Sequence, residues 1–294
     1  MISKLKGLGV AMVTPFNSKN EIDYMATERM VEHLISGGVN YIVVLGTTGE
    51  AVVLSKEEKR NLVSFAIDKC NGRVPIVMGV GGNNTGSLIK ELNTFDFEGV
   101  DAILSVTPYY NKPTQQGLLL HYKALAANSP RPIILYNVPG RTGVNMDATT
   151  TLTLAHEEEK IIAIKEASGD LNQQSYILRD RPDSFLVLSG DDALALPQFA
   201  LGFDGVISVI GNAFPHEFST LVRSALEGKF TEASRVYLKL VEIIDLLFVD
   251  GNPAGVKAAL SIKGVIDNNI RLPLAPVTDA TYSKLEGVIK NLSV

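Results

Sequence analysis

Cysteine is almost absent from this sequence: Cys70 is the only one, so an internal disulfide is excluded. Such usage is typical of a reducing compartment, and we interpret Cys70 as a partly buried structural thiol at a helix end. No uninterrupted apolar run approaches the roughly 20 residues that span a bilayer. The first residues also lack the apolar core and small-residue cleavage site of a signal peptide. We therefore expect a soluble, cytoplasmic protein without membrane contact.

Blocks of like charge are also scarce. The net charge is −5, and acidic and basic side chains are interspersed along the chain. We interpret the one short acidic run, residues 157–159, as the solvated end of a helix. A nucleic-acid partner would require lysine and arginine clustered on one face, so we expect none.

What the chain does contain is a repeated pattern of short apolar runs. Most are apolar at nearly every position, which is typical of strands buried on both faces of a parallel sheet. Helical patterns separate them, as at residues 23–36 and 56–70. Eight strand–helix repeats predict an α/β fold, the (β/α)8 TIM barrel, which a chain of 294 residues is long enough to form. The predicted strands are residues 8–13, 41–45, 74–78, 102–106, 132–136, 161–165, 185–189 and 205–209.

An open, doubly wound sheet is the alternative arrangement. Its phosphate-binding glycine fingerprint is missing after the first predicted strand, at residues 13–17. The glycine-rich segment at residues 79–82 follows the third strand and lacks the full motif. We interpret that segment as a turn with unusual backbone dihedrals, and the barrel is favoured.

The chain continues well beyond the eighth strand, further than one closing helix requires. Its patterns predict helices at residues 214–227, 231–248, 254–263 and 278–292. No serine/glycine linker separates them from the barrel. We assign residues 1–227 to a catalytic barrel and residues 228–294 to a C-terminal helical extension packed on it.

The predicted strands end in residues rich in hydroxyl groups, at the edge where TIM-barrel enzymes place their active sites. All four histidines fall elsewhere, in helical or loop segments. Metal catalysis normally uses histidine and carboxylate ligands at this edge, so we expect no metal. The polar residues at the strand ends are Thr14, Thr47, Thr48, Thr107, Tyr109, Tyr110, Tyr136, Asn137, Lys165, Glu166, Ser189, Asp191, Asp192 and Ser208.

Lys165 ends the apolar run 161–164, so its stem emerges from a buried strand. Burial disfavours the ammonium form, and a neutral amine attacks a carbonyl carbon to form a Schiff base. The ordinary alternative is a lysine on the outer face or rim, paired with Glu166. At the end of a barrel strand we favour the nucleophile.

Nearby polar residues suit the same chemistry. Tyr136 ends the preceding strand, where a phenol can shuttle protons during Schiff-base formation. Arg141, in the following loop, can bind a carboxylate through two parallel hydrogen bonds. Thr47 and Thr48 offer hydroxyl and backbone N–H groups. Singly, each has an ordinary interpretation as a packed tyrosine, a solvated arginine or a strand former, and only their convergence on one rim supports a site.

The motifs at residues 46–50, 107–113, 136–142, 164–170 and 189–192 lie in a characteristic order and spacing. Together they resemble the dihydrodipicolinate synthase family, part of the pyruvate-dependent class I aldolase superfamily. The resemblance covers nearly the whole chain. It implies condensation of pyruvate with L-aspartate 4-semialdehyde through a lysine Schiff base, giving 4-hydroxy-tetrahydrodipicolinate for diaminopimelate and lysine biosynthesis. It also implies no cofactor, and a homodimer or a homotetramer built as a dimer of dimers.

The resemblance further implies roles for the catalytic residues. Lys165 forms the pyruvate Schiff base, and Tyr136 donates and accepts protons. Thr47 links Tyr136 to Tyr110, which the partner subunit would contribute across a tight dimer interface.

Substrate binding is implied at other positions of the same motifs. Thr48 and the backbone of Ile207 would bind pyruvate, and Arg141 the carboxylate of the aldehyde. Gly190 would give main-chain contacts near the nucleophile.

Other functions remain open from the sequence. N-acetylneuraminate lyase shares the lysine and tyrosine chemistry, but it typically has Ser-Thr at Thr47-Thr48 and less use for Arg141. Another keto-acid aldolase, or a non-catalytic barrel that senses a small acid, are the further alternatives.

The chain departs from the family pattern at two places. Lys56 and Lys59 stand where lysine-inhibited members often have histidine, and Ser87 where they have glutamate. An ammonium effector loses its carboxylate partner there, so we expect weak or absent inhibition by lysine. In residues 252–257, Gly255 replaces the second proline of the family's Asn-Pro-x-Pro-x-Lys segment, and we expect a looser extension.

Overall fold

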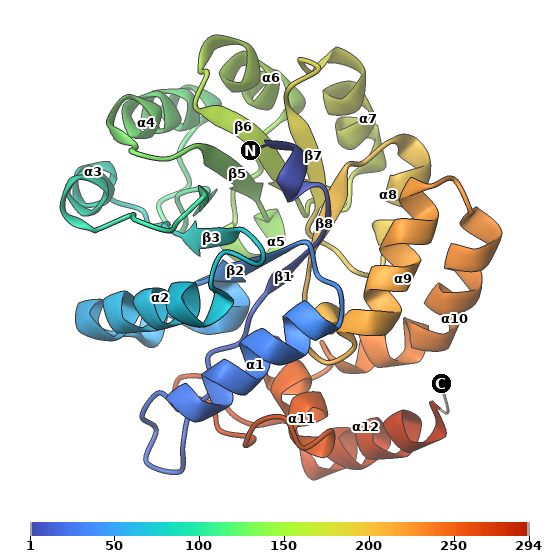
Figure 1. The fold of residues 1–294 in the computed structure, drawn as a ribbon. Coiled ribbons are helices and arrows are strands. Elements are labelled where there is room, and N and C mark those ends of the chain that lie inside the picture. Colours follow the sequence, from blue (N-terminus) through green and yellow to red (C-terminus); the bar gives the residue numbers. More distant parts are fainter. Residues whose placement is uncertain (1, 293–294) are drawn as a thin grey trace.

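The chain folds around a barrel of parallel strands, which lies at the centre of Figure 1 with helices around it. The computed structural model describes residues 2–292. Its strands are β1 (Gly7–Ala11), β2 (Tyr41–Val44), β3 (Ile76–Gly79), β4 (Ala102–Val106), β5 (Ile133–Asn137), β6 (Ile161–Glu166), β7 (Leu186–Ser189) and β8 (Gly205–Ser208). Strand β8 pairs with β1 and closes the sheet, which confirms the predicted TIM barrel.

Helices cover the outside of the barrel in strand–helix alternation (Figure 1). Several begin at a Ser, Thr, Asp or Asn whose side chain accepts a backbone N–H of the first turn, as Asp23, Ser55 and Thr114 do. The helices around the barrel are α1 (Tyr24–Ser36), α2 (Lys56–Cys70), α3 (Thr85–Thr94), α4 (Gln115–Asn128), α6 (Ala148–Glu157), α7 (Leu171–Asp180), α8 (Ala195–Leu201) and α9 (Pro215–Leu226).

The strands bury both faces, as their continuous apolar runs predict. Val43, Val77 and Leu188 belong to a cluster inside the barrel, whereas Ile42 and Leu135 belong to the layer under the helices. Near the amino end of the barrel, the Tyr41 ring takes up the interior. A Cβ on Gly9 would lie 2.2 Å from that ring, so only glycine fits beside it. Side chains therefore fill this end of the barrel.

The glycine-rich segment at residues 79–82 corrects one expectation. Gly79 and Gly81 do not have positive φ angles. A Cβ on Gly79 would lie 2.1 Å from the Leu45 carbonyl oxygen, and one on Gly81 2.6 Å from Val106 Cγ1. Glycine is needed here because neighbouring segments approach closely. Leu45 (φ 62°) and Glu50 (φ 53°), after the second strand, are among the residues that do have positive φ angles.

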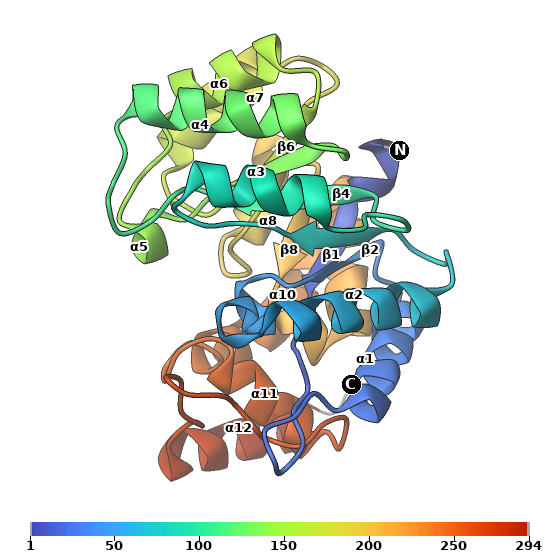
Figure 2. The ribbon, with the colours of Figure 1, turned by 90° about the vertical axis from the view of Figure 1, so that its left-hand side faces the viewer.

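The C-terminal part forms α10 (Phe230–Leu246), α11 (Ala254–Ile262) and α12 (Asp279–Asn291), close to the predicted helices. Helix α12 packs on α10 and α11, and α10 packs on α8 and α9. Figure 2 shows α11 and α12 together at one end of the molecule, and the division of the chain at residue 227 stays a prediction. Among the residues described, no helix combines the length and apolar character needed to cross a membrane.

Gly255 corrects a second expectation. It lies buried in the first turn of α11, against the end of α10. A Cβ there would meet the Leu247 carbonyl oxygen at 2.2 Å. The glycine therefore permits a close contact between the two segments, and the extension is not loosened at this position.

Candidate active site

Lys165 and Tyr136 face the same cavity. They are register partners on the neighbouring strands β6 and β5, so their side chains point to the same side of the sheet. Lys165 is 5% exposed, and its Nζ lies 4.3 Å from the centre of the Tyr136 ring. The structure thus brings together the amine and the phenol that the sequence placed on adjacent strands.

Glu166, the next residue, points away from Lys165. Its carboxylate accepts hydrogen bonds from the Ser168 backbone N–H at 2.6 Å, from Asn137 Nδ2 at 3.1 Å and from Gln173 Nε2 at 3.2 Å. Burial raises the pKa of Glu166, and these hydrogen bonds oppose that shift. The alternative of an outward-facing Lys165 paired with Glu166 is therefore wrong.

A cavity of about 560 Å³ opens at the carboxyl ends of the strands, beside the Lys165 amine. Most of the site residues expected from the sequence line it. They are Lys165, Tyr136, Thr47, Thr48, Arg141 and Gly190. Within residues 2–292, neither Lys165 nor Arg141 forms an ion pair with a carboxylate. The cavity therefore presents the Lys165 amine and the Arg141 guanidinium to a substrate without a competing carboxylate partner.

Gly190 gives the Lys165 side chain its space. A Cβ at this position would lie 3.0 Å from Lys165 Cε and 2.7 Å from the Ala167 side chain.

The turn after β7 is fixed by Asp192, whose Oδ2 accepts the backbone N–H groups of Val209 and Ile210, both at 2.8 Å. Burial raises the pKa of Asp192, and the hydrogen bonds oppose the shift.

One wall of the cavity comes from the C-terminal part of the chain, a contribution that the sequence patterns do not predict. Asn252 donates a hydrogen bond from Nδ2 to Thr48 Oγ1 at 3.0 Å. The only signal in the sequence was the length of chain after the eighth strand, which exceeds what one closing helix requires. The residues from this segment that line the cavity are Ile244, Asp245, Phe248, Val249 and Asn252.

A smaller cavity of about 270 Å³ adjoins the first and shares Thr47, Tyr136 and Arg141 with it. Arg141 was expected in a loop, but it lies in the one-turn helix α5 (Pro139–Thr142). The remaining lining is largely apolar and includes Val52 and Tyr109. The two cavities together form a cleft on both sides of the Tyr136 phenol.

Two of the expected residues do not line the cavity around Lys165. Ile207 is buried inside the barrel, and Val209 lines the cavity instead. Tyr110 is 88% exposed and has a φ of 75°, which is unusual for a residue with a bulky side chain. Within this one chain, Tyr110 is therefore not part of the site.

Comparisons of the sequence and of the structure with known proteins point to the same family. The model of the dihydrodipicolinate synthetase family matches residues 4–292. The chain is 52% identical over 290 residues to the 4-hydroxy-tetrahydrodipicolinate synthase of Parabacteroides distasonis, covering 99% of this chain and 98% of that one. The crystal structure of dihydrodipicolinate synthase from Aquifex aeolicus is 40% identical, with a TM-score of 0.94 over 98% of both chains. A monomeric dihydrodipicolinate synthase variant is 38% identical, with a TM-score of 0.95 over 98% of this chain and 97% of that one.

Proposed function

The chain belongs to the dihydrodipicolinate synthetase family, and we propose that Lys165 carries out the condensation of pyruvate with L-aspartate 4-semialdehyde. The enzyme is a lyase whose product is 4-hydroxy-tetrahydrodipicolinate, an intermediate of lysine and diaminopimelate biosynthesis. The observation that carries the residue assignment is the Lys165 amine, buried above the Tyr136 ring and free of any ion pair within residues 2–292.

The chemistry follows from this pair. The neutral amine attacks the keto carbon of pyruvate, and the Tyr136 phenol returns a proton to the oxygen that leaves as water. Loss of a methyl proton from the resulting imine gives an enamine, whose terminal carbon attacks the aldehyde carbon of the second substrate. The amino group of that substrate then replaces the Lys165 nitrogen, which closes the ring and frees the enzyme.

The carboxylates of the two substrates are assigned to different residues of the cavity. Thr48 Oγ1 accepts a hydrogen bond from Asn252, so its own proton is free to donate to the pyruvate carboxylate. We assign the aldehyde carboxylate to Arg141, which lines both cavities. Gly190 lines the cavity beside Lys165, and its main chain is the proposed contact for pyruvate there. The Ile207 backbone stays a proposed contact, although the Ile207 side chain is buried inside the barrel and Val209 lines the cavity.

Tyr110 enters the mechanism only if a second copy of the chain supplies it. Tyr110 combines an exposed aromatic ring with a strained positive φ, and strain of this kind is concentrated at functional sites. The apolar cavity beside Thr47 and Tyr136 offers a place for the phenol of a partner subunit's Tyr110. A homodimer is thus the smallest complete enzyme, and Tyr110→Phe should lower kcat while leaving the dimer intact in analytical ultracentrifugation.

Lysine inhibition should be weak or absent. Lys56, Lys59 and Ser87 line one cleft between α2 and α3, together with the further cations Arg60 and Lys90. Glu91 is the only carboxylate lining that cleft, so a cationic effector meets net repulsion there. Turnover should be unchanged by millimolar lysine, and inhibition at micromolar concentrations would contradict this expectation.

Borohydride trapping tests the central assignment. Pyruvate and sodium borohydride together should add one reduced pyruvyl group to each chain, and peptide mapping should place it on Lys165. Lys165→Arg keeps the charge but should give no adduct. A wild-type chain that gains no mass from pyruvate and borohydride would refute the mechanism. Substrate assays then distinguish the synthase from the sugar lyase: the enzyme should turn over aspartate semialdehyde and should release no pyruvate from sialic acid.

A further inference from the structure

Glu50 immediately follows the Thr47–Gly49 turn, and its carboxylate is buried in contact with the C-terminal part of the chain. It is 2% exposed, and Oε1 pairs with Lys257, a lysine of α11 that is itself fully buried. Oε2 accepts the backbone N–H of Arg271 at 3.0 Å. Burial of an ion pair costs desolvation energy, which is offset only where the geometry is good and further hydrogen bonds are present. The Arg271 N–H supplies such a hydrogen bond to Glu50.

The backbone around Glu50 needs such support. Leu45 and Glu50, on either side of the two threonines, both have positive φ angles, which cost free energy for residues other than glycine. The turn is fastened at further points: Thr14 Oγ1 donates to the Gly49 carbonyl at 2.6 Å, and Asn252 donates to Thr48. A strained turn persists only where its surroundings determine it in this way.

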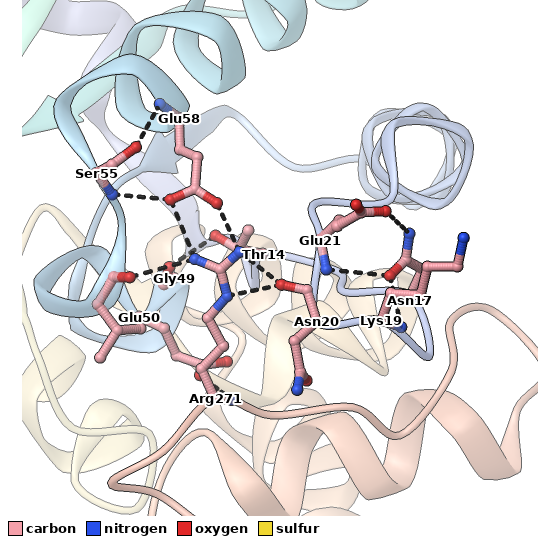
Figure 3. A network of polar contacts seen from close by, with 11 residues as sticks. Thr14, Asn17, Lys19, Asn20, Glu21, Gly49, Glu50, Ser55, Glu58 and Arg271 are labelled. Atoms are coloured by element: carbon pink, nitrogen blue, oxygen red, sulfur yellow. Dashed lines mark hydrogen bonds and ion pairs between the residues drawn. The ribbon is translucent and has the colours of Figure 1, made fainter.

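The C-terminal partners of Glu50 are themselves anchored on the barrel. Lys257 Nζ lies 4.2 Å from the centre of the Phe16 ring and donates to the Asn269 carbonyl at 2.9 Å. Figure 3 shows the Arg271 guanidinium between the Glu58 carboxylate and the Asn20 carbonyl, with the Thr14–Gly49 contact beside it. The Glu50–Lys257 ion pair therefore connects the Thr47–Gly49 turn to a C-terminal segment that has several contacts of its own with the barrel.

We propose that Glu50 is a positioning residue that, through its buried pair with Lys257, holds the Thr47–Thr48 turn in the geometry that binds pyruvate. This inference rests on the proposed function, in which Thr48 binds the pyruvate carboxylate and Thr47 carries protons. The C-terminal segment is then part of the active site. Arg141 lies on α5, outside the turn, so aldehyde binding does not depend on Glu50.

Glu50→Gln is the decisive variant because it keeps the size of the side chain and removes the charge. The KM for pyruvate should rise about tenfold, since small misplacements of binding groups have effects of this order or larger. The KM for aspartate semialdehyde should stay within about twofold, because Arg141 is not displaced. A loss of folded protein alone would lower the apparent kcat and leave both KM values unchanged.

Glu58→Gln is the matched control. Glu58 also pairs with the C-terminal segment, through Arg271, but it lies beyond the threonine turn. This variant should lower Tm and leave both KM values at wild-type levels. If Glu50→Gln behaves in the same way, the positioning role is refuted.

Two further variants keep the test valid if Glu50→Gln folds poorly. The double variant Glu50→Gln/Lys257→Met removes the unpaired buried charge, so Tm should recover while the pyruvate KM stays raised. Asn252→Ala removes only the donor to Thr48 and should also raise the pyruvate KM. A double variant in which KM recovers together with Tm would overturn the proposal. Failure of the wild-type chain to trap pyruvate would instead refute the proposed function.

Discussion

Lys165 and Lys257 are both buried with the ammonium group close to an aromatic ring, yet they occupy opposite situations. Lys257 is completely enclosed, pairs with Glu50 and donates to the Asn269 carbonyl. Lys165 has no ion pair within residues 2–292 and borders a cavity of about 560 Å³. The comparison shows that burial alone does not make a lysine a nucleophile. An amine with its partners in place is structural, and one that faces space without a counter-charge is available for chemistry.

The difference also has an electrostatic side. Burial lowers the pKa of Lys257, and the neighbouring Glu50 opposes that shift. The carboxylate keeps the lysine charged and bound to its place, which is the opposite of what attack on a carbonyl needs. The two regions thus use the same residue type for separate purposes, catalysis on β6 and structural support on α11.

The largest effect is expected from Lys165→Ala. The variant should lose roughly 10³-fold or more in kcat, because no other group supplies the covalent step. Its Tm should change little, since the amine has no ion-pair partner to leave behind. Steady-state kinetics and calorimetry measure the two quantities. Residual activity within tenfold of wild type would remove Lys165 from the mechanism and break the comparison.

Lys257→Met should show the reverse pattern. It leaves Glu50 charged and unpaired in the interior, which costs about 3–5 kcal/mol of stability. At saturating pyruvate, borohydride should still modify Lys165 in the folded protein. Urea unfolding and peptide mapping measure these outcomes. Loss of the adduct in a chain that remains folded would show that Lys257 takes part in the chemistry.

The sequence predicted one of these lysines and missed the other for identifiable reasons. Continuous apolar runs mark strands buried on both faces, and Lys165 and Tyr136 end two neighbouring runs, so a shared rim could be predicted. That the two side chains face one cavity follows from the register of β5 and β6, which only the structure gives. Lys257 lies within a helical pattern, and its partner Glu50 is distant in the sequence, so only the folded chain brings them together.

Backbone geometry was equally hidden. The glycines at residues 79–82 suggested unusual dihedrals, but they have none, and the positive φ angles on either side of the two site threonines fall on Leu45 and Glu50, which are not glycines. The same holds for the cavity wall from the C-terminal segment, which depends on how α10 docks beside the barrel. The strands and helices could be predicted because they follow from local periodicity in the sequence. The backbone angles of the turn and the cavity wall could not, because they depend on contacts between distant segments.

Gly190→Ala probes the space around Lys165 without removing it. The new methyl group would lie 3.0 Å from Lys165 Cε and 2.7 Å from the Ala167 side chain. Overpacking of this kind costs about 1–3 kcal/mol, and the flexible lysine stem should yield first, so kcat/KM should fall about tenfold to a hundredfold. Gly287→Ala in α12 is the control, since within the described residues the added carbon would have no neighbour within 4 Å beyond the adjacent residues and the backbone of its own helix. Unchanged turnover in Gly190→Ala would show that the Lys165 position is not critical.

The smallest effect is expected at Glu58. Its carboxylate pairs with the Arg271 guanidinium, and the backbone N–H of Arg271 binds Glu50, the partner of Lys257. The Arg271 guanidinium lowers the pKa of Glu58 from 4.5 to about 2. A carboxyl with a lowered pKa in the folded state stabilises the fold above pH 4.5, and this contribution is lost as the pH falls toward 2. Because the pair is partly exposed, Glu58→Gln should cost about 1 kcal/mol or less at pH 7. Glutamine can still cap α2, so the Tm difference between wild type and variant reports the ion pair and should shrink between pH 4.5 and pH 3. A difference that stays constant over this range would mean that Glu58 contributes through packing, and that the charge needed in this region is confined to Glu50 and Lys257.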